Sequence, residues 1–413
     1  MKILLIRLKE LFFENQKLCC VPPVGLWSIR TYIKTYSDAE VEICDEHMGQ
    51  KIEDFLNNVN YDIIGISVQF SIQHSEYLKM AKKVRQLNQN ATIIAGGFHA
   101  SAVEKPKEVD EIVHGEGEGY FSRLFFGKEI EDFDSIPYPQ FDIKEIEEYW
   151  RIDKAHDLES KTKKWITIET SRGCSNKCSF CGIPRFWGKW KGHSAEYLYD
   201  HFKYLKDKGI EEVFIADDNL SANRARFLKL IEHLNNLGIW WSAPNGIQVN
   251  TINNPEVLNA LEGSTCWKLC LPFETGVKSS AKLMNIGGKY MEFDKAFNLV
   301  ISLKNIGIKT NGFFVIGYPG ETMDNVKETL EFANSLPFDG RHVHIASPFP
   351  GSPLYDLCKE KGYLVYDGEE LYKQLLLADG GLIKTDKIDP KELFEIKAKD
   401  REDAIERRKQ GKY

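Results

Sequence analysis

The chain has 413 residues, of which 42% are hydrophobic and 28% are charged, and 54 Lys and Arg against 61 Asp and Glu leave a formal net charge of −7. These values are typical of a globular protein with two or three domains, each able to bury its own core. The acidic balance argues against a nucleic-acid-binding protein, because phosphate contacts usually need a basic face. No apolar run approaches the roughly 20 residues of a membrane-spanning helix, and charged residues follow the short apolar start Met1–Arg7, so we expect neither a membrane segment nor a signal peptide.

The first 125 residues alternate short β-branched apolar runs with amphipathic segments. The clearest helix is Ser75–Leu87, where Tyr77, Met80, Ala81 and Val84 share one face. Strand–helix alternation at this spacing predicts a doubly wound parallel sheet. The expected strands are Lys2–Arg7, Val41–Cys44, Ile63–Val68, Thr92–Ala95 and Glu111–Val113.

An acidic connector that contains prolines, Asp132–Asp142, follows this first region. Because proline cannot donate to a central strand, the connector indicates a domain boundary. We therefore expect a first domain at 1–130, a linker at 131–160, a second domain at 161–360 and a mainly helical C-terminal segment at 361–413.

From Trp165 the alternation restarts with longer helices. Ser194 can cap one helix and Asn254-Pro255 can open another, while Arg224 and Arg226 are expected as surface charges of a helix. Six such units predict an α/β fold, a partial (β/α)6 version of the eight-stranded barrel with functional loops at the C-terminal strand ends. The expected strands are Trp165–Thr170, Glu212–Ala216, Trp240–Ala243, Lys268–Phe273, Lys309–Ile316 and Arg341–Ala346.

Three cysteines, Cys174, Cys178 and Cys181, lie within eight residues directly after the first of these strands. Three thiolates can bind three irons of a cubane cluster and leave the fourth iron for an outside ligand. A zinc site would usually need four protein ligands, and three unrelated buried thiols are the other alternative. The chain has nine cysteines, an odd number, which is typical of a reducing compartment such as the cytoplasm. We expect the others to be small buried hydrophobic residues: Cys19, Cys20, Cys44, Cys266, Cys270 and Cys358.

The Cys-x3-Cys-x2-Cys spacing, with Arg172-Gly173 before it and Phe180 before the last cysteine, resembles the signature of the radical S-adenosylmethionine (radical SAM) superfamily. The resemblance implies a 4Fe–4S cluster held by Cys174, Cys178 and Cys181, with SAM on the open iron. Further motifs at successive strand ends resemble SAM-contacting positions of the family, although each can also be an ordinary turn or helix cap. These positions are Asp217 and Asp218 near the SAM amino group, Glu274 at the ribose, Gly317 and Glu321 beside the adenine, and the closing loop Pro348–Tyr355.

The first domain resembles the cobalamin-binding domain that is fused ahead of many radical SAM barrels. Asp45–Gly49 departs from the motif in which a histidine binds cobalt, because its glycine arrives one residue early, and this puts His47 in question as a ligand. The alternative is that the glycine loops only shape turns. The resemblance implies cobalamin contacts at Pro22, Gly25, Ser67, Gly96, Gly97, His99, Gly115, Glu116 and Gly117.

These resemblances imply a cobalamin-dependent radical SAM enzyme that methylates an unactivated carbon of a small-molecule or peptide precursor. One alternative is a radical SAM rearrangement, cyclisation or oxidation without methyl transfer, either cobalamin-associated or cobalamin-free. Another is a non-catalytic iron–sulfur redox or sensor protein. A methylthiotransferase is disfavoured because the usual second set of cluster cysteines is missing from the first domain. The expected partners are the substrate and a flavodoxin- or ferredoxin-like electron donor, with no nucleic acid and no membrane.

Overall fold

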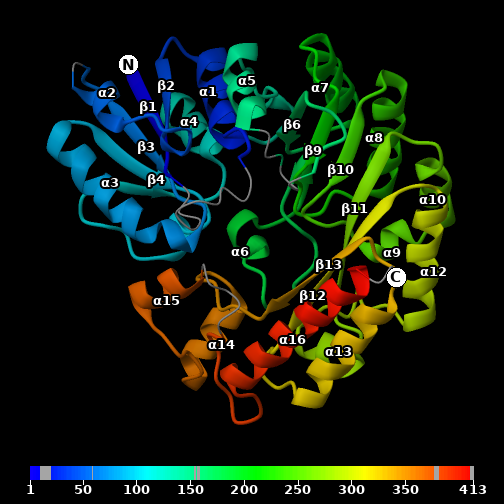
Figure 1. Cartoon of the computed structure of the whole chain (residues 1–413). Coiled ribbons are helices and arrows are strands. Elements are labelled where there is room, and N and C mark those ends of the chain that lie inside the picture. The colour runs from blue at the N-terminus through cyan, green and yellow to red at the C-terminus, as the bar shows by residue number, and fades with distance from the viewer. Residues whose placement is uncertain (10–19, 58, 153–154, 156–158, 376–380, 410–413) are drawn as a thin grey trace. The chain divides into compact units, whose positions relative to one another are not determined.

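The computed structural model describes the chain except for residues 10–19, 58, 153–154, 156–158, 376–380 and 410–413 (Figure 1). The chain divides into two compact units, Met1–Thr167 and Ile168–Tyr413, and the division falls inside strand β6. Within the described ranges, no helix is both long enough and apolar enough to cross a membrane.

The first unit contains a five-stranded parallel sheet in the order β2-β1-β3-β4-β5. The doubly wound parallel sheet predicted from the sequence is thus confirmed, with all five strands in place. In this order the chain reverses direction across the sheet between β1 and β3, and open parallel sheets bind ligands in the crevice at that point. The strands are β1 (Lys2–Arg7), β2 (Glu40–Asp45), β3 (Ile63–Ser67), β4 (Thr92–Gly96) and β5 (Glu111–Val113).

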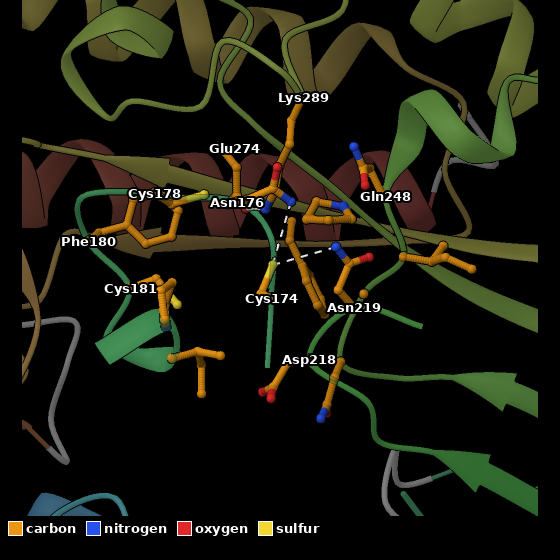
Figure 2. Close-up of a pocket in the computed structure, with 17 residues that line it drawn as sticks. Cys174, Asn176, Cys178, Phe180, Cys181, Asp218, Asn219, Gln248, Glu274 and Lys289 are labelled. Carbon is orange, nitrogen blue, oxygen red and sulfur yellow. Dashed lines mark hydrogen bonds and ion pairs between the residues drawn. The ribbon is translucent and has the colours of Figure 1, made fainter. Parts of the chain in front are cut away.

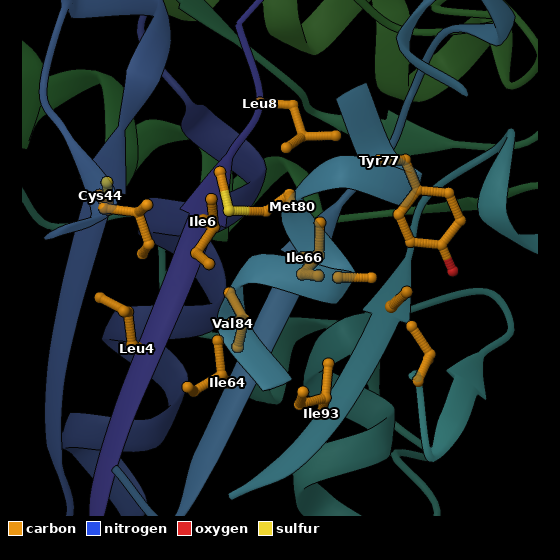
Figure 3. Close-up of a cluster of buried hydrophobic side chains, with 14 of the residues drawn as sticks. Leu4, Ile6, Leu8, Cys44, Ile64, Ile66, Tyr77, Met80, Val84 and Ile93 are labelled. Atoms are coloured by element: carbon orange, nitrogen blue, oxygen red, sulfur yellow. The ribbon is translucent and has the colours of Figure 1, made fainter. Parts of the chain in front are cut away.

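Alternate residues of β1 serve two separate cores, because successive strand side chains point to opposite faces. Leu4 and Ile6 pack with Tyr77 and Met80 of α3, as Figure 3 shows, whereas Ile3 and Leu5 pack with residues of α1 and α4. Helices therefore cover both faces of the sheet. The helices of this unit are α1 (Val24–Tyr36), α2 (Ile52–Leu56), α3 (His74–Leu87), α4 (Gly117–Phe126) and α5 (Ile143–Ile152), with short 3-10 turns η1 (Glu46–Met48), η2 (Ser71–Gln73), η3 (Ala100–Ala102) and η4 (Phe133–Ser135).

The second sheet has six parallel strands in the order β13-β12-β11-β10-β9-β6. Its strands run in sequence order across the sheet, which confirms the partial (β/α)6 barrel. The strands are β6 (Trp165–Ile168), β9 (Glu212–Ile215), β10 (Trp240–Ala243), β11 (Cys266–Glu274), β12 (Lys309–Ile316) and β13 (Gly340–Ile345), and a small antiparallel ladder is formed by β7 (Ser171–Arg172) and β8 (Lys191–Gly192).

Side-chain caps start the helices at the positions that the sequence indicated. The Ser194 hydroxyl accepts a hydrogen bond from the backbone N–H of Tyr197, and the Asn254 side chain accepts one from Glu256. The helices of this unit are α6 (Ile183–Trp187), α7 (Ala195–Asp207), α8 (Arg224–Leu237), α9 (Val249–Ile252), α10 (Pro255–Leu261), α11 (Lys278–Leu283), α12 (Phe293–Asn305), α13 (Met323–Ser335), α14 (Pro353–Lys361), α15 (Gly368–Gln374) and α16 (Pro390–Lys409).

An aromatic core joins β11 and β12 to helix α13. Phe273 stacks on Phe314 with ring centroids 6.3 Å apart, and both rings meet the edge of Phe332. Gly276 follows β11 directly under Phe332, where an added Cβ would lie 2.3 Å from the Phe332 Cγ. This close contact leaves no room for a side chain at residue 276.

We predict that Gly276→Ala lowers the free energy of unfolding by about 1 to 3 kcal/mol, because the new methyl group would overpack the Phe332 site. The matched control is Gly287→Ala in the same connection, where an added Cβ has no atom within 4 Å. Urea unfolding of both variants measures the difference. Equal loss of stability in the two variants would contradict this account.

Candidate functional site

The cysteine-bearing loop lies between two other loops of the same unit. The Ser179 N–H donates to the Met284 carbonyl at 2.9 Å, and the Ser179 carbonyl accepts from the Leu354 N–H at 2.8 Å. The Asn285 side chain also donates to the Lys177 carbonyl at 2.8 Å. Segments that follow β11 and β13 therefore hold the middle of the loop through backbone atoms.

The start of the loop is clamped by Arg226 of α8. Its side chain is 8% exposed and donates to the carbonyls of His193, at 2.6 Å, and of Thr170. The prediction of Arg226 as a surface charge is wrong, because the guanidinium replaces water as the partner of these two carbonyls. Arg224 is on the surface as predicted, in an exposed ion pair with Glu256.

Gly173, the residue before the first cysteine, has a positive φ of 84°. An added Cβ there would lie 3.1 Å from the Lys189 carbonyl and 3.3 Å from the Trp190 Cα. Both the backbone conformation and the tight space therefore disfavour a side chain at residue 173, and glycine lets the chain turn sharply into Cys174.

The three cysteines line one pocket of about 440 Å³ at the C-terminal ends of the strands (Figure 2). The structure thus brings together the three thiols that the sequence singled out. Polar and charged residues that line the same pocket include Asp218, Asn219, Gln248, Glu274 and Lys289.

Cys174 accepts hydrogen bonds from two amide side chains, Asn176 at 3.5 Å and Asn219 at 3.6 Å. Burial raises the pKa of the Cys178 thiol, against the lowering effect of Lys289, and burial raises the pKa of Cys181 to about 12. A metal or another positive charge is therefore needed to keep Cys178 and Cys181 as thiolates at neutral pH.

The donor set fits a polynuclear centre better than a single ion. Among the described residues, no three His, Cys, Asp or Glu side chains are grouped so that they could hold one metal ion. A cubane cluster takes one thiolate on each of three irons, so its ligands surround a shared volume rather than meet at a point. Three thiols around one pocket satisfy that requirement.

The remaining described cysteines are not among the residues that line this pocket. They are buried, which confirms the prediction for Cys20, Cys44, Cys266, Cys270 and Cys358, whereas Cys19 lies outside the described residues.

Glu274 reaches the pocket through an irregularity at the end of β11. The pairing register with β12 shifts between Pro272 and Glu274, and Glu274 has a φ of 66°. A positive φ is costly for a residue other than glycine, and the bulge turns the carboxylate inward while Phe273 stays in the aromatic core. Burial raises the pKa of this carboxyl group, against the effect of Lys289, whose Nζ lies 3.4 Å from the Glu274 Oε1.

Asp217 and Asp218 differ in their surroundings. Asp217 is buried and accepts hydrogen bonds from the Thr170 N–H and hydroxyl, both at 2.6 Å, and from the Ser171 hydroxyl. Asp218 lines the pocket and accepts from the Gly173 N–H at 2.9 Å, and burial raises its pKa to about 6. Of the two, only Asp218 is placed to meet a ligand in this pocket.

Gly317 and Glu321 lie outside the residues that line the pocket. An added Cβ on Gly317 would lie 2.3 Å from a methyl carbon of Leu393 in α16, and Glu321 is fully buried and accepts from the Tyr318 N–H at 2.8 Å. Both residues have local packing roles, and their contact with a nucleotide stays a prediction. The closing loop Pro348–Tyr355 ends in a cap, in which Ser352 accepts from the Tyr355 N–H.

In the first unit the predicted cofactor residues lie in loops that follow β3, β4 and β5, and at the start of α1. Two of the glycines allow close packing. An added Cβ on Gly97, which has a φ of 99°, would lie 2.7 Å from the Val68 carbonyl, and one on Gly117 would lie 2.4 Å from Ile29. Gly25, by contrast, has open space around it. The others are Pro22, which is buried, Ser67 and Gly96 at strand ends, and Gly115 and Glu116, which precede α4.

His47 follows β2, which is the edge strand of the first sheet. A ligand in the crevice between β1 and β3 is approached by loops from those two strands. The sheet order therefore argues against His47 as a cofactor ligand for a reason that the sequence motif did not contain. The loop after β1 includes residues 10–19, which lie outside the described residues.

His99 lies after β4 and is completely buried. Its Nε2 is 2.9 Å from the Nδ1 of His74 at the start of α3. Burial, with a further effect of His74, lowers the pKa of His99 to about 3.

The pocket is also lined by Lys289, Asn176 and Gln248, none of which was predicted from the sequence. Nor were His342 and His344, which are exposed on β13 and whose rings pack against Phe313 of the pocket wall. The Gly287-Gly288 pair before Lys289 was the only nearby signal, because a lysine in a loop has no diagnostic spacing.

Comparison with known proteins identifies both units. The Radical SAM superfamily matches residues 168–333, and the B12 binding domain matches residues 19–125. A protein named as an uncharacterized methyltransferase from Pyrococcus horikoshii is 26% identical over 81% of this chain and 78% of its own length. Bacteriochlorophyllide d C-8(2)-methyltransferase from Chlorobaculum tepidum is 25% identical over 86% of this chain and 80% of its own.

Among solved structures, the radical SAM methyltransferase TsrM from Kitasatospora setae, with cobalamin and a 4Fe–4S cluster bound, superposes with a TM-score of 0.68. The match covers 89% of this chain and 79% of that chain at 18% sequence identity. At this identity the similarity establishes a common fold.

We predict that His99→Gln makes the first unit less sensitive to acid. His99 is neutral when buried, and the unfolded chain takes up its proton as the pH falls through about 6.5, so wild type loses stability between pH 6.5 and 3. Between pH 7.5 and pH 5 wild type should lose about 2 kcal/mol more unfolding free energy than the variant. Urea unfolding at the two pH values measures this, with His114→Gln at an exposed position as the control, and an equal loss in wild type and His99→Gln would contradict it.

Proposed function

The chain belongs to the radical SAM superfamily and has a B12-binding domain ahead of its radical SAM domain, and from this premise we propose that it is a cobalamin-dependent radical SAM methyltransferase. The observation that carries the proposal is the convergence of three thiols, a buried carboxylate and a buried cation on one pocket at the C-terminal ends of barrel strands. The substrate is a small molecule or peptide with an unactivated carbon. The methyltransferase names of the relatives support this reaction class.

Cys174, Cys178 and Cys181 are the residues that would hold the 4Fe–4S cluster. With SAM and cobalamin also bound, the protein would carry an electron source for SAM cleavage and a carrier for the methyl group. The protein itself has to hold these groups in position and keep water away from them.

Residues around the thiols are suited to these tasks. Asn176 and Asn219 donate to Cys174 and fix the position of its sulfur. Cys178 lies in an apolar cluster with Ala281, Met284 and other buried residues, which limits access of water to that side. Asp218 and Glu274 offer carboxylate oxygens toward the pocket as acceptors for the amino and hydroxyl groups of SAM.

Asp217 has a positioning role in this proposal. Its two oxygens accept from Thr170 and Ser171, directly before Arg172-Gly173, and so fix the backbone that leads into the cysteine loop. This arrangement divides the acidic pair, with one carboxylate shaping the loop and the other facing the ligand.

In the first unit, the loops after β3, β4 and β5 would hold cobalamin. Gly97 brings the loop after β4 onto the backbone at Val68, next to Ser67. Parallel sheets of this order bind ligands at these strand ends. A flavodoxin- or ferredoxin-like protein would supply the electron, because a cluster of this kind needs an external one-electron donor.

The second candidate is a radical SAM reaction without methyl transfer. The methyltransferase names of the relatives favour the first candidate over this one, in which cobalamin is either associated with the reaction or absent. The products separate the two, because methyl transfer leaves S-adenosylhomocysteine in addition to 5′-deoxyadenosine.

We predict that anaerobic purification with cobalamin supplied yields about four irons per chain, as a cubane cluster requires, and one cobalt. With a reductant and SAM the protein should form 5′-deoxyadenosine. Metal analysis, the ultraviolet–visible spectrum and chromatography of products measure these outcomes. Iron without cobalt would favour the second candidate, and an unchanged cluster spectrum on adding SAM would favour a redox or sensor protein.

We predict that Cys178→Ala removes the cluster and 5′-deoxyadenosine formation but leaves cobalamin uptake intact, because the thiol lies in the second unit and the cobalamin loops lie in the first. The matched control is Cys358→Ala, which deletes another buried thiol from the same apolar cluster. It should keep its iron. Equal iron loss in both variants would indicate a packing role for Cys178.

A further inference from the structure

Lys289 is the only cation among the described residues that line the thiol pocket. Its side chain is 13% exposed, and the side chain of its partner Glu274 is 9% exposed. Figure 2 shows the two pointing toward each other beside Asn176 and the cysteines. Because both groups are withdrawn from water, solvent and salt screen their charges only weakly.

Each member of this pair also acts on the thiols. Lys289 lines the same pocket as Cys174 and Cys178, and its positive charge opposes the rise in the Cys178 pKa that burial causes. Glu274 acts on Cys178 with the opposite sign. The thiols therefore experience two fixed charges of opposite sign, held on the two sides of one ion pair.

The backbone holds both charges in place. Glu274 and Asn285 are the only residues other than glycine with a positive φ in the described part of the chain. Glu274 ends β11, and Asn285 lies in the connection between that strand and Lys289. Asn285 ties this connection to the cysteine loop through the Lys177 carbonyl, and the Lys289 N–H donates to the Ile286 carbonyl at 2.7 Å. Glu274 and Lys289 therefore lie at the two ends of a segment that is hydrogen-bonded to the cysteine loop.

The structure assigns a task to this pair that goes beyond holding SAM, and we propose that Lys289 and Glu274 set the reduction potential of the cluster in opposite directions. The inference rests on the proposed function, in which the three cysteines hold a 4Fe–4S cluster. Reduction adds one electron, and hence one negative charge, to a group that already carries three thiolates. A nearby cation stabilises the added charge and raises the potential, whereas a nearby carboxylate lowers it, since net charge and hydrogen bonds to sulfur both tune such clusters.

A merely structural ion pair would behave differently. Removing either partner of a buried pair leaves an uncompensated charge and loosens the surroundings in both cases. Structural damage would therefore change the reduction potential of the cluster in the same direction in both variants. Only an electrostatic role shifts the potential in opposite directions.

The sample is the full chain with its cluster reconstituted, in the absence of SAM. It is titrated with dithionite in the presence of redox mediators. Electron paramagnetic resonance measures the reduced cluster at each potential. Lys289→Met should make reduction of the cluster at least tenfold less favourable, which lowers its reduction potential by at least 59 mV for one electron. Glu274→Gln should raise the reduction potential. Lys289→Arg and the double variant Lys289→Met with Glu274→Gln should stay near wild type. The matched control is Lys282→Met, an exposed lysine of α11.

Opposite shifts in the two single variants support the inference. No shift, or shifts in the same direction, overturns it while leaving the cluster assignment intact. Should Lys289→Met retain no iron, Glu274→Gln decides, and an unchanged or more negative potential in that variant overturns the inference. A wild-type chain that takes up no cluster would instead overturn the proposed function itself.

Discussion

The site depends on one short stretch of backbone, the segment around Ser179 that hydrogen-bonds to both Met284 and Leu354. Three thiols from a single loop can surround a shared volume only if the loop is held open, because a free eight-residue loop pays a large conformational entropy cost to keep its side chains apart. Four contacts offset that entropy cost: the two backbone hydrogen bonds, the bond from Asn285 to the Lys177 carbonyl and the bond from Arg226 to the Thr170 carbonyl. Much of the second unit's loop structure can be understood as support for this arrangement.

The same region concentrates conformational strain and buried charge. Glu274 and Asn285 adopt backbone conformations that cost free energy, and Glu274 and Lys289 are ionisable groups withdrawn from water. Features of this kind persist where the surrounding structure over-determines them, and they cluster at functional sites. Phe273, the neighbour of Glu274 in the chain, packs with Phe314 and Phe332 in the aromatic core. This packing stabilises the strained backbone conformation of Glu274.

In the first unit, the position of a motif in the sheet decides whether it can contact a ligand. The sequence of Asp45–Gly49 resembles part of a cobalt-binding motif, but in the folded sheet this segment follows the edge strand β2. The glycine loops after β3 and β4 do lie at the edge where this class of sheet binds ligands. Close packing at Gly97 and Gly117 shows that these residues also serve the fold, so their presence alone does not separate a cofactor role from a structural one.

The sequence by itself determined the two sheets, their parallel strands and the three thiols, because strand–helix alternation and the spacing of cysteines are local properties of the chain. Resemblance to the radical SAM superfamily at successive strand ends also indicated Asp218 and Glu274. Only the tertiary structure decided that Asp217 faces its own loop, that Arg226 is buried and that Lys289 joins the thiol pocket. The physical reason is that these outcomes depend on which loops meet at the C-terminal edge of the sheet and on which carbonyls are left without water, and residues far apart in the chain determine both.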